Sequence, residues 1–254
     1  MLSVIIKTKN SGATLCDTLE SVKEADEIIV VDEHSNDDTI DIIKEYKAKI
    51  IYADSLEINE ILNKTIQEVK NDWIFIVQDD EIVPNKLFFE INQYIENPKK
   101  NKFCISLSQK NFYLEKEIKS ARKKDILRIF KKDYAEFKND YSTELKLKQG
   151  KIFKLNKNFK INNCYLLKFN NKNIFEDFKD NIQNKYLKLK NQNKNRTSLF
   201  LKPLFCFLFI YFIKGALFDG KRGFIYSFKL AIEKFLEECF IYERNIKNDF
   251  WQIK

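Results

Sequence analysis

Short apolar runs alternate with helix-periodic stretches through the first hundred residues. The runs that are long enough for buried strands lie at residues 2–7, 27–31, 49–52 and 73–77. Between and after them, apolar residues recur three or four positions apart, which predicts helices over residues 15–22, 40–46, 58–69 and 84–95. Repeated strand-helix-strand units of this length are typical of a mostly parallel sheet with helices on its faces, so we expect an α/β fold.

The C-terminal part of the chain has a different pattern. Residues 203–213 form an uncharged run of 11 residues between Lys202 and Lys214, whereas a membrane-spanning helix needs about 20 apolar residues. From Phe224 to Tyr242, apolar residues fall on one face of a helix. Together they predict a C-terminal helical extension that contacts a membrane surface without crossing it. A helix packed on the rest of the protein, or a dimer contact, is the alternative.

Charge divides the chain as well. Residues 1–98 hold 9 Lys against 21 Asp and Glu, a net charge of −12, whereas residues 146–196 hold 14 Lys and Arg against three acids, a net charge of +11. We therefore expect an α/β domain over residues 1–145, a basic linker or variable segment over 146–198, and an apolar and amphipathic helical region over 199–254. The basic segment suits an anionic membrane surface, or is a solvated lysine-rich face. It lacks the interleaved aromatic motifs of a nucleic-acid binder.

Composition excludes several kinds of site. The chain has a single histidine, His34, and five glycines, so a multi-histidine metal centre, a glycine-rich dinucleotide fingerprint and a P-loop are excluded. Its five cysteines are scattered and form no Cys-x-x-Cys pair, and the N-terminus lacks a signal-peptide pattern. A reducing, cytoplasmic compartment fits best, and any chemistry is expected to depend mostly on carboxylates.

Polar residues follow three of the predicted strands at the point where each strand ends. They are Thr8-Lys9-Asn10, then Asp32 to Thr39, then Gln78-Asp79-Asp80-Glu81. Ligands of parallel sheets bind at the carboxyl ends of the strands, and clustered carboxylates repel one another unless a cation lies among them. The pattern predicts Mg²⁺ or Mn²⁺ with a phosphorylated substrate. Asp37 and Asp38 have a simpler explanation as acids at the start of a helix.

These ordered motifs resemble a family 2 glycosyltransferase with the GT-A fold. The resemblance rests on residues 3–10, on Ile28 to Asp32 with Ser35 and Asp38-Thr39, on Asn63, and on residues 73–81. Within the family, the sequence is similar to the subgroup that adds sugars to the lipopolysaccharide inner core. Arg128-Ile129-Phe130 is similar to that subgroup's Arg-Leu-Phe motif, and residues 215–223 are similar to its Gly-x-x-Asp-Gly-x-x-Gly pattern.

The resemblance implies roles for particular residues. Asp32 would accept a hydrogen bond from the base of a nucleotide sugar, and Thr8 and Asn10 would line the same pocket. Asn63 would lie near the nucleotide or sugar. Asp80 matches the last residue of the family's Asp-x-Asp motif and would bind the Mg²⁺ or Mn²⁺ that bridges the diphosphate.

Two departures from the family pattern stand out. Gln78 replaces the first carboxylate of the Asp-x-Asp motif, and Asp79 in the middle is expected to restore an acid nearby. Where the subgroup has Val-His-Glu, this chain has residues 142–144, which leave Glu144 as the candidate general base, with Asp140 and Glu136 as rivals. Arg128 either binds the diphosphate or anchors a strand.

The sequence therefore predicts an inverting, metal-dependent glycosyltransferase. It would move a hexose from a nucleotide diphosphate sugar, UDP-linked, to a lipopolysaccharide core or another lipid-linked acceptor. It would act in the cytoplasm as a peripheral protein on the inner face of the cytoplasmic membrane, with no nucleic acid as partner. The alternative is a degenerate, non-catalytic protein that binds nucleotide sugars or a membrane. A nucleotidyltransferase is less favoured, because only Gly12 is available for a phosphate loop near the start.

Overall fold

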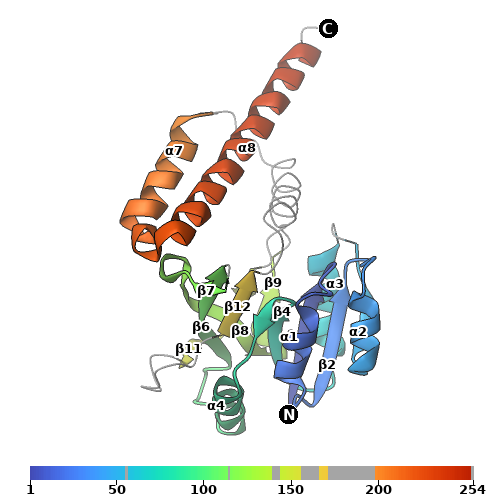
Figure 1. Ribbon diagram of the computed structural model, residues 1–254. Helices are drawn as coiled ribbons and strands as arrows, with labels where there is room; N and C mark the ends of the chain where they lie inside the picture. The colour runs from blue at the N-terminus through green and yellow to red at the C-terminus, as the bar shows by residue number, and fades with distance from the viewer. Residues whose placement is uncertain (55–56, 114, 139–143, 156–165, 171–197, 253–254) are drawn as a thin grey trace. The chain divides into compact units, whose positions relative to one another are not determined.

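The computed structural model describes residues 1–54, 57–113, 115–138, 144–155, 166–170 and 198–252 of the 254-residue chain (Figure 1). Its described residues fall into two units. Unit 1 comprises residues 1–115 and 122–171, and unit 2 comprises residues 116–121 and 172–254. The two are described separately below.

Unit 1 begins with the expected alternation of strands and helices. Its first seven elements are β1 (Leu2–Thr8), α1 (Leu15–Val22), β2 (Glu27–Asp32), α2 (Thr39–Glu45), β3 (Lys49–Tyr52), α3 (Ile58–Glu68) and β4 (Trp73–Gln78). β1 pairs in parallel with both β2 and β4, and β2 pairs in parallel with β3. α1 and α2 connect neighbouring parallel strands, whereas α3 connects β3 to β4, which lies on the other side of β1. The predicted α/β fold is confirmed in this part of the chain.

The sheet continues beyond β4 with strands of mixed direction. These elements are β5 (Glu81–Ile82), α4 (Asn85–Glu96), β6 (Cys104–Tyr113), β8 (Lys123–Lys131), β11 (Ile152–Lys154) and β12 (Leu166–Asn170). The strand order is β3-β2-β1-β4-β8-β6-β12-β5, with β11 also paired to β6. After the short 3-10 helix η2 (Lys132–Tyr134), β9 (Ala135–Phe137) and β10 (Leu145–Leu147) form a separate antiparallel pair.

Alternation along the central strands divides the core between the two faces of the sheet. Val4 and Ile6 of β1 pack with residues of α1 and α4, whereas Ile5 packs with residues of α3. All three side chains are completely buried. Burial of one such side chain stabilises a fold by about 1.5–3 kcal/mol, so both faces fix the position of β1 and of the loop that follows it.

Two segments correct the predicted division of the chain. We expected residues 146–198 to be a linker or variable segment, but β11 and β12 lie in the sheet of unit 1. Phe153 and Leu166 are buried in its core because they lie on short strands that pair with β6. Residues 156–165 and 171–197 of the expected linker lie outside the described residues.

Unit 2 contains the helices expected near the C-terminus. They are α7 (Leu201–Leu208), the π-helical turn η3 (Phe209–Ile213), the 3-10 turn η4 (Ala216–Asp219) and α8 (Gly220–Gln252), with the short segments β7 (Lys116–Glu117) and η1 (Lys119–Ala121). No single helix of the described chain is long and apolar enough to cross a membrane. The pair Leu201–Ile213 and Ala216–Ile246 passes that test jointly but is bent by 71°.

Candidate functional site at the carboxyl ends of three strands

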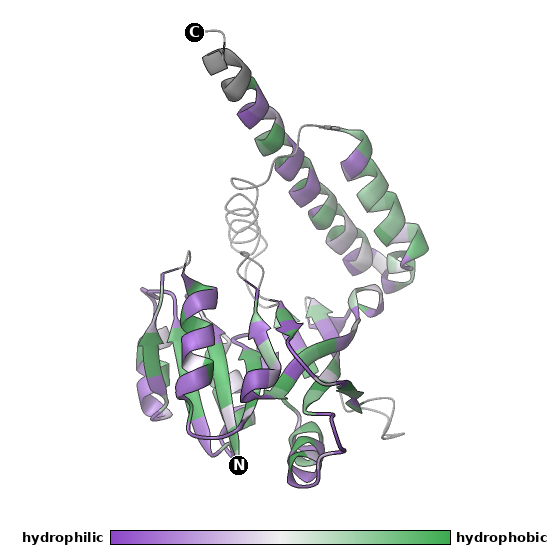
Figure 2. Cartoon of the chain, turned by 180° about the vertical axis from the view of Figure 1, so that it is seen from behind, coloured by the Kyte–Doolittle hydropathy of each residue, from purple (hydrophilic) through white to green (hydrophobic). Residues whose placement is uncertain are grey.

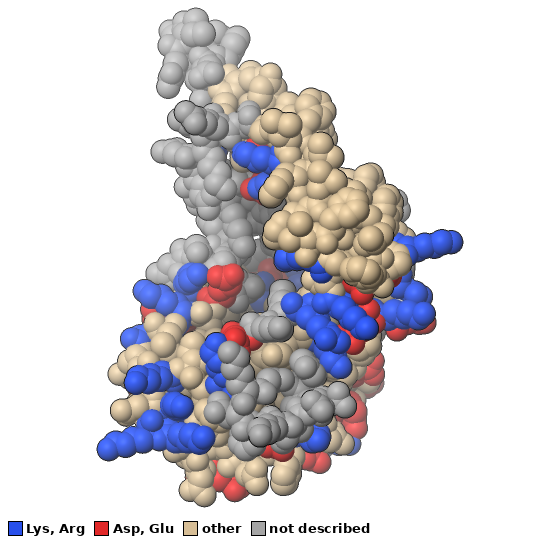
Figure 3. Space-filling model, turned by 90° about the vertical axis from the view of Figure 1, so that its left-hand side faces the viewer, with Lys and Arg blue, Asp and Glu red and all other residues tan. Residues whose placement is uncertain are grey.

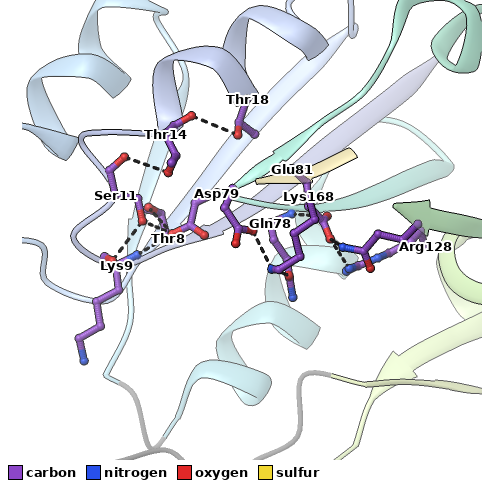
Figure 4. Close-up of polar contacts among 12 residues, drawn as sticks. Thr8, Lys9, Ser11, Thr14, Thr18, Gln78, Asp79, Glu81, Arg128 and Lys168 are labelled. Atoms are coloured by element: carbon purple, nitrogen blue, oxygen red, sulfur yellow. Dashed lines mark hydrogen bonds and ion pairs between the residues drawn. The ribbon is translucent and has the colours of Figure 1, made fainter. Parts of the chain in front are cut away.

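The three polar loops meet at one edge of the sheet, as the sequence predicts. In the strand pairing, Thr8 at the end of β1 lies opposite Asp32 at the end of β2, and Lys7 lies opposite Gln78 at the end of β4. Asp79, just beyond β4, links the first loop to the fourth strand (Figure 4). Its Oδ2 accepts hydrogen bonds from Thr8 Oγ1 at 3.2 Å, from the Lys9 backbone N–H at 3.3 Å and from the Ser11 hydroxyl.

The first and second loops are tied together as well. The Asn10 backbone N–H donates to Ser35 Oγ at 2.8 Å, and Asn10 Oδ1 accepts from the Asn36 N–H at 2.9 Å. Asn10 has a φ of 48°, the left-handed conformation that asparagine tolerates better than most residues. The carboxylate of Asp32 is buried and accepts from both the backbone N–H and the hydroxyl of Ser35. The roles of Asn10 and Asp32 in binding a nucleotide stay predictions.

Asp80 has a cationic partner from a distant part of the sequence. Lys168 of β12 places its Nζ 2.8 Å from Asp80 Oδ1 and 2.5 Å from Gln78 Oε1. Burial lowers the pKa of Lys168, but the negative charges of Asp80, Glu81 and Asp79 outweigh burial, so its pKa lies above the ordinary value. The side chain is therefore an ammonium ion at neutral pH, held between the two residues that flank Asp79.

Glu81 forms a second ion pair that is more deeply buried. Its Oε1 accepts from Arg128 Nη2 at 2.6 Å and from Gln109 Nε2 at 3.1 Å, and its Oε2 accepts from the Gln78 backbone N–H at 2.9 Å. The Glu81 side chain is 0% exposed and that of Arg128 is 8% exposed. This pair anchors β8 to β5, and strand anchoring is one of the two roles considered for Arg128. Its binding of a diphosphate stays a prediction.

The arrangement of these acids does not fit a divalent ion. Such an ion needs several oxygen ligands directed at one point, but Gln78 and Asp80 both direct an oxygen at the ammonium of Lys168, and Asp79 accepts hydrogen bonds from the first loop. Among the residues that the structure describes, no group of three or more His, Cys, Asp or Glu side chains is placed to hold a metal. The metal role of Asp80 stays a prediction.

The other predicted residues lie along α3 and the β9–β10 pair. Asn63 donates from Nδ2 to the Phe137 carbonyl at 3.1 Å and accepts from the Phe137 N–H at 2.8 Å, so both ends of its amide hold β9. Glu144 is 73% exposed and pairs with Lys138 at 2.9 Å. Its rival Glu136 pairs with Lys148 at 3.4 Å, and Asp140 lies outside the described residues. The base and sugar-binding roles of these residues stay predictions.

Comparison with known proteins identifies the family. The profile described as Glycosyl transferase family 2 matches residues 3–143, more than half of the chain. The chain belongs to glycosyl transferase family 2. It is therefore a sugar-transferring enzyme, and the family part of the resemblance is confirmed. The lipopolysaccharide inner-core subgroup stays a prediction.

Relatives of this glycosyltransferase cover nearly its whole length. An uncharacterized glycosyltransferase of Rickettsia typhi is 26% identical over 263 residues, which cover 97% of this chain and 88% of the relative. Among solved structures, S. aureus TarS 1–349 in complex with UDP-GlcNAc has a TM-score of 0.51 at 11% identity, covering 93% of this chain and 91% of that one. The likeness to TarS supports the GT-A type of fold.

A second solved structure is similar over a smaller part of the chain. Glucosyl-3-phosphoglycerate synthase from Mycobacterium tuberculosis, in complex with Mn²⁺, UDP and glucosyl-3-phosphoglycerate, has a TM-score of 0.35 at 22% identity. The similarity covers 44% of this chain and 44% of that one. A likeness at this level carries no argument about the metal requirement of the present chain.

Sequence reasoning missed Lys168 at this edge of the sheet, and it missed the partners that bury Glu81. Lys168 lies in a segment that reads as basic and variable, 88 residues after Asp80. The available signal was the run Leu166-Leu167-Lys168-Phe169, in which one lysine interrupts an apolar strand pattern. Glu81 was placed in the acidic loop, but its burial depends on Arg128 and Gln109, which come from β8 and β6.

Proposed function

We propose that this glycosyltransferase moves a hexose from a nucleotide diphosphate sugar, UDP-linked, to a hydroxyl group of a lipid-linked or lipopolysaccharide core acceptor. The observation that carries the proposal is the hydrogen-bonded junction of three loops at the carboxyl edge of the sheet, where α/β proteins bind nucleotides. In it, the Asp79 carboxylate fixes the loop after β1 against the end of β4.

The proposed reaction is a single in-line displacement with inversion at the sugar. The bond between the donor's anomeric carbon and the diphosphate oxygen breaks, and its electron pair stays on the diphosphate. The acceptor oxygen forms the new bond to that carbon, and its proton passes to a carboxylate, with Glu144 as the candidate and Glu136 and Asp140 as rivals. Because negative charge grows on the departing diphosphate, catalysis depends on positive charge and N–H donors placed there.

The proposal of a lipid-linked acceptor rests on unit 2. Its helices carry a series of large apolar side chains that are more than a third exposed: Phe200, Leu201, Leu204, Phe205, Leu208, Phe209, Phe212, Ile213, Leu217, Phe218, Phe224, Ile225 and Phe228. Figure 2 shows α7 as almost continuously hydrophobic, and Figure 3 shows uncharged surface gathered over these helices. We name these residues the apolar face. An apolar surface of this size with lysines at its borders suits a peripheral protein on the inner, anionic leaflet of the cytoplasmic membrane.

A donor and acceptor screen tests the function. The purified full chain would be incubated with UDP-, GDP- and dTDP-sugars and with lipid-linked acceptors extracted in detergent, and products would be identified by mass spectrometry. We expect transfer from a UDP-sugar. The Asp80→Ala variant should lose at least about 100-fold in rate, because Asp80 holds Lys168, whose ammonium group is directed at the loop after β4.

The control is Asp41→Ala, which removes a solvent-exposed acid that pairs only with Lys44 among the contacts described. It should transfer sugar at the parent rate. Near-normal transfer by Asp80→Ala would contradict the assignment of this edge as the active site. Binding of UDP-sugars without transfer to any acceptor would instead favour the degenerate binding protein.

A further inference from the structure

Two strand pairings, and not a flexible side chain alone, bring Lys168 to the loop after β4. β12 pairs with β5 so that Lys168 lies opposite Glu81 and Leu167 lies opposite Ile82. The Phe169 backbone N–H also donates to the Asp80 carbonyl at 2.8 Å. On its other edge, β12 pairs in parallel with β6 along five residues. The backbone of Lys168 is therefore fixed beside the same loop that carries Gln78, Asp79 and Asp80.

The Lys168–Asp80 pair differs from the Arg128–Glu81 pair in its access to ligands. Arg128 and Glu81 are 8% and 0% exposed, whereas the side chains of Lys168 and Asp80 are 25% and 18% exposed. Figure 4 shows Lys168 directed at Gln78, with the Arg128–Glu81 pair on the side away from the first loop. Of these two pairs, the Lys168–Asp80 pair is the one exposed enough for a diphosphate to reach.

The contacts of Lys168 place its ammonium group beside Asp80, where a divalent ion would otherwise bind. Its two described ligands are one carboxylate, Asp80, and one neutral amide oxygen, Gln78. A divalent ion beside Asp80 would have to displace this ammonium group, because Gln78 and Asp80 both direct an oxygen at it. An ammonium group has three N–H donors, and these two contacts use two of them. The third can bond an anionic oxygen, at the short distances typical of ammonium-phosphate pairs.

We propose that Lys168 supplies the positive charge on the nucleoside diphosphate that a divalent ion would otherwise supply, so that donor binding and transfer need no divalent metal. This inference rests on the proposed function. As the bond from the sugar to the diphosphate breaks, the electron pair moves onto the leaving oxygen, and the Lys168 ammonium hydrogen-bonds the resulting anion without giving up its proton. Asp80 and Gln78 are positioning residues, because they hold the ammonium in place.

Titration calorimetry of the full chain with UDP tests the proposal without relying on turnover. Binding would be measured in EDTA and in 5 mM Mn²⁺, on the order of the concentrations used to saturate weak metal sites. We expect dissociation constants within about threefold of each other. Lys168→Met should weaken binding in EDTA at least about 10-fold, because it removes a hydrogen bond from a charged donor. Lys168→Arg keeps the charge and should recover most of the affinity.

The matched control is Lys154→Met. Lys154 of β11 also forms a lysine-aspartate pair, with Asp125 at 2.8 Å, and lies in the same sheet. Circular dichroism would show whether each variant is folded. The comparison of UDP binding in EDTA and in Mn²⁺ uses the parent chain, so it remains valid even if a variant does not fold. We expect Lys154→Met to bind UDP like the parent.

The outcomes separate the two proposals. UDP binding that appears only with Mn²⁺, or that is unchanged in Lys168→Met, would overturn the role of Lys168 and leave the proposed function standing. Failure to bind UDP, GDP and dTDP under either condition would overturn the proposed function, and the Lys168 proposal with it. Metal-independent UDP binding that is lost in Lys168→Met and recovered in Lys168→Arg would support both.

Discussion

At the scale of single residues, the two ion pairs beside the loop after β4 should contribute differently to stability. The Glu81 carboxylate is fully buried and depends on Arg128, Gln109 and a backbone N–H for its hydrogen bonds. Removal of one partner would leave a charge without its counter-ion in the protein interior, which costs far more than loss of a solvated pair. The side chains in the exposed pair of Lys44 and Asp41 are 65% and 81% exposed, so water solvates either partner when the other is removed.

We predict that Arg128→Met lowers the free energy of unfolding by about 3–5 kcal/mol. The measurement is urea unfolding followed by fluorescence of Trp73, a buried residue of β4, in a Trp251→Phe background. The double variant Arg128→Met/Glu81→Gln should be more stable than the single one, because no unpaired charge remains. Lys44→Met, the control, should change stability by less than about 1 kcal/mol. If Arg128→Met also lowered the free energy of unfolding by less than about 1 kcal/mol, the structural role of the Arg128–Glu81 pair would be contradicted.

The sequence predicts the position of a site residue when that residue directly follows a strand with a clear apolar pattern. It does not predict a partner that comes from a distant part of the chain. The positions of Thr8, Asp32 and Asp79 at one edge follow from where three apolar runs end, and their convergence is confirmed. The ammonium beside Asp80 could not be predicted in the same way. Its place depends on the antiparallel pairing of β12 with a two-residue strand, β5, which no local pattern specifies.

At the scale of elements, residues 215–223, which are similar to the Gly-x-x-Asp-Gly-x-x-Gly pattern but have one more residue before the aspartate, form a structural corner in unit 2. Gly215 and Gly220 have φ values of 78° and 65°, which side chains disfavour. Asp219 accepts hydrogen bonds from the backbone N–H groups of Lys119 and Ser120 at 3.1 Å each, and from the Ser120 hydroxyl at 2.7 Å. This segment therefore joins η4 to η1 and leads into α8.

Gly223 gives the sharpest test of this corner. A Cβ atom there would lie 1.9 Å from the Ala216 carbonyl oxygen, so α8 and η4 would have to separate. We predict that Gly223→Ala destabilises the corner by about 1–3 kcal/mol. Hydrogen exchange at residues 116–121 and 216–223 should then become about 5- to 150-fold faster. Lys221→Ala, an exposed change in the first turn of the same helix, is the control. Unchanged exchange in Gly223→Ala would contradict the close packing.

The elements themselves were predictable to different degrees. Continuous apolar runs predicted β1 to β4, and strong period-3.6 patterns predicted α1 to α4, within a few residues of their observed bounds. The short strands β11 and β12 were missed because three and five residues of a lysine- and asparagine-rich stretch carry little periodicity. Their place in the sheet comes from pairing with the long strand β6, a non-local contact that the sequence does not reveal.

At the scale of the whole molecule, the two units carry different features of the proposed function. Unit 1 carries the loops at the carboxyl edge of the sheet, and unit 2 carries the apolar face. The exposed apolar face of unit 2 suits an acceptor that stays in a membrane. An enzyme that modifies a lipid-linked sugar meets its acceptor more often when it binds the same membrane surface. Lys214 directly follows η3, and Lys221 lies in the first turn of α8. Both side chains are exposed, and their positive charge would attract anionic headgroups.

We therefore predict that the full chain sediments with vesicles of phosphatidylcholine containing phosphatidylglycerol, and more weakly with phosphatidylcholine alone. Phe205 and Phe212 of the apolar face are 68% and 56% exposed. Replacement of both by Ser should lower the partition coefficient at least about 100-fold, since burial of each phenylalanine contributes about 1.5–3 kcal/mol. The matched control is Phe89→Ser on α4 of unit 1, which is 64% exposed and should partition like the parent.

The same variants separate a membrane surface from a dimer contact, the other explanation of the apolar face. If the face joins two copies of the chain, analytical ultracentrifugation without lipid should show a dimer that Phe205→Ser/Phe212→Ser dissociates, and vesicle binding should not change. If the face binds lipid, the double variant should lose vesicle binding. Binding of the parent chain should also weaken as the salt concentration rises, because salt screens the attraction between the bordering lysines and the anionic lipids. Equal partitioning of the parent and the double variant would refute the membrane role, because no other described surface presents comparable apolar area.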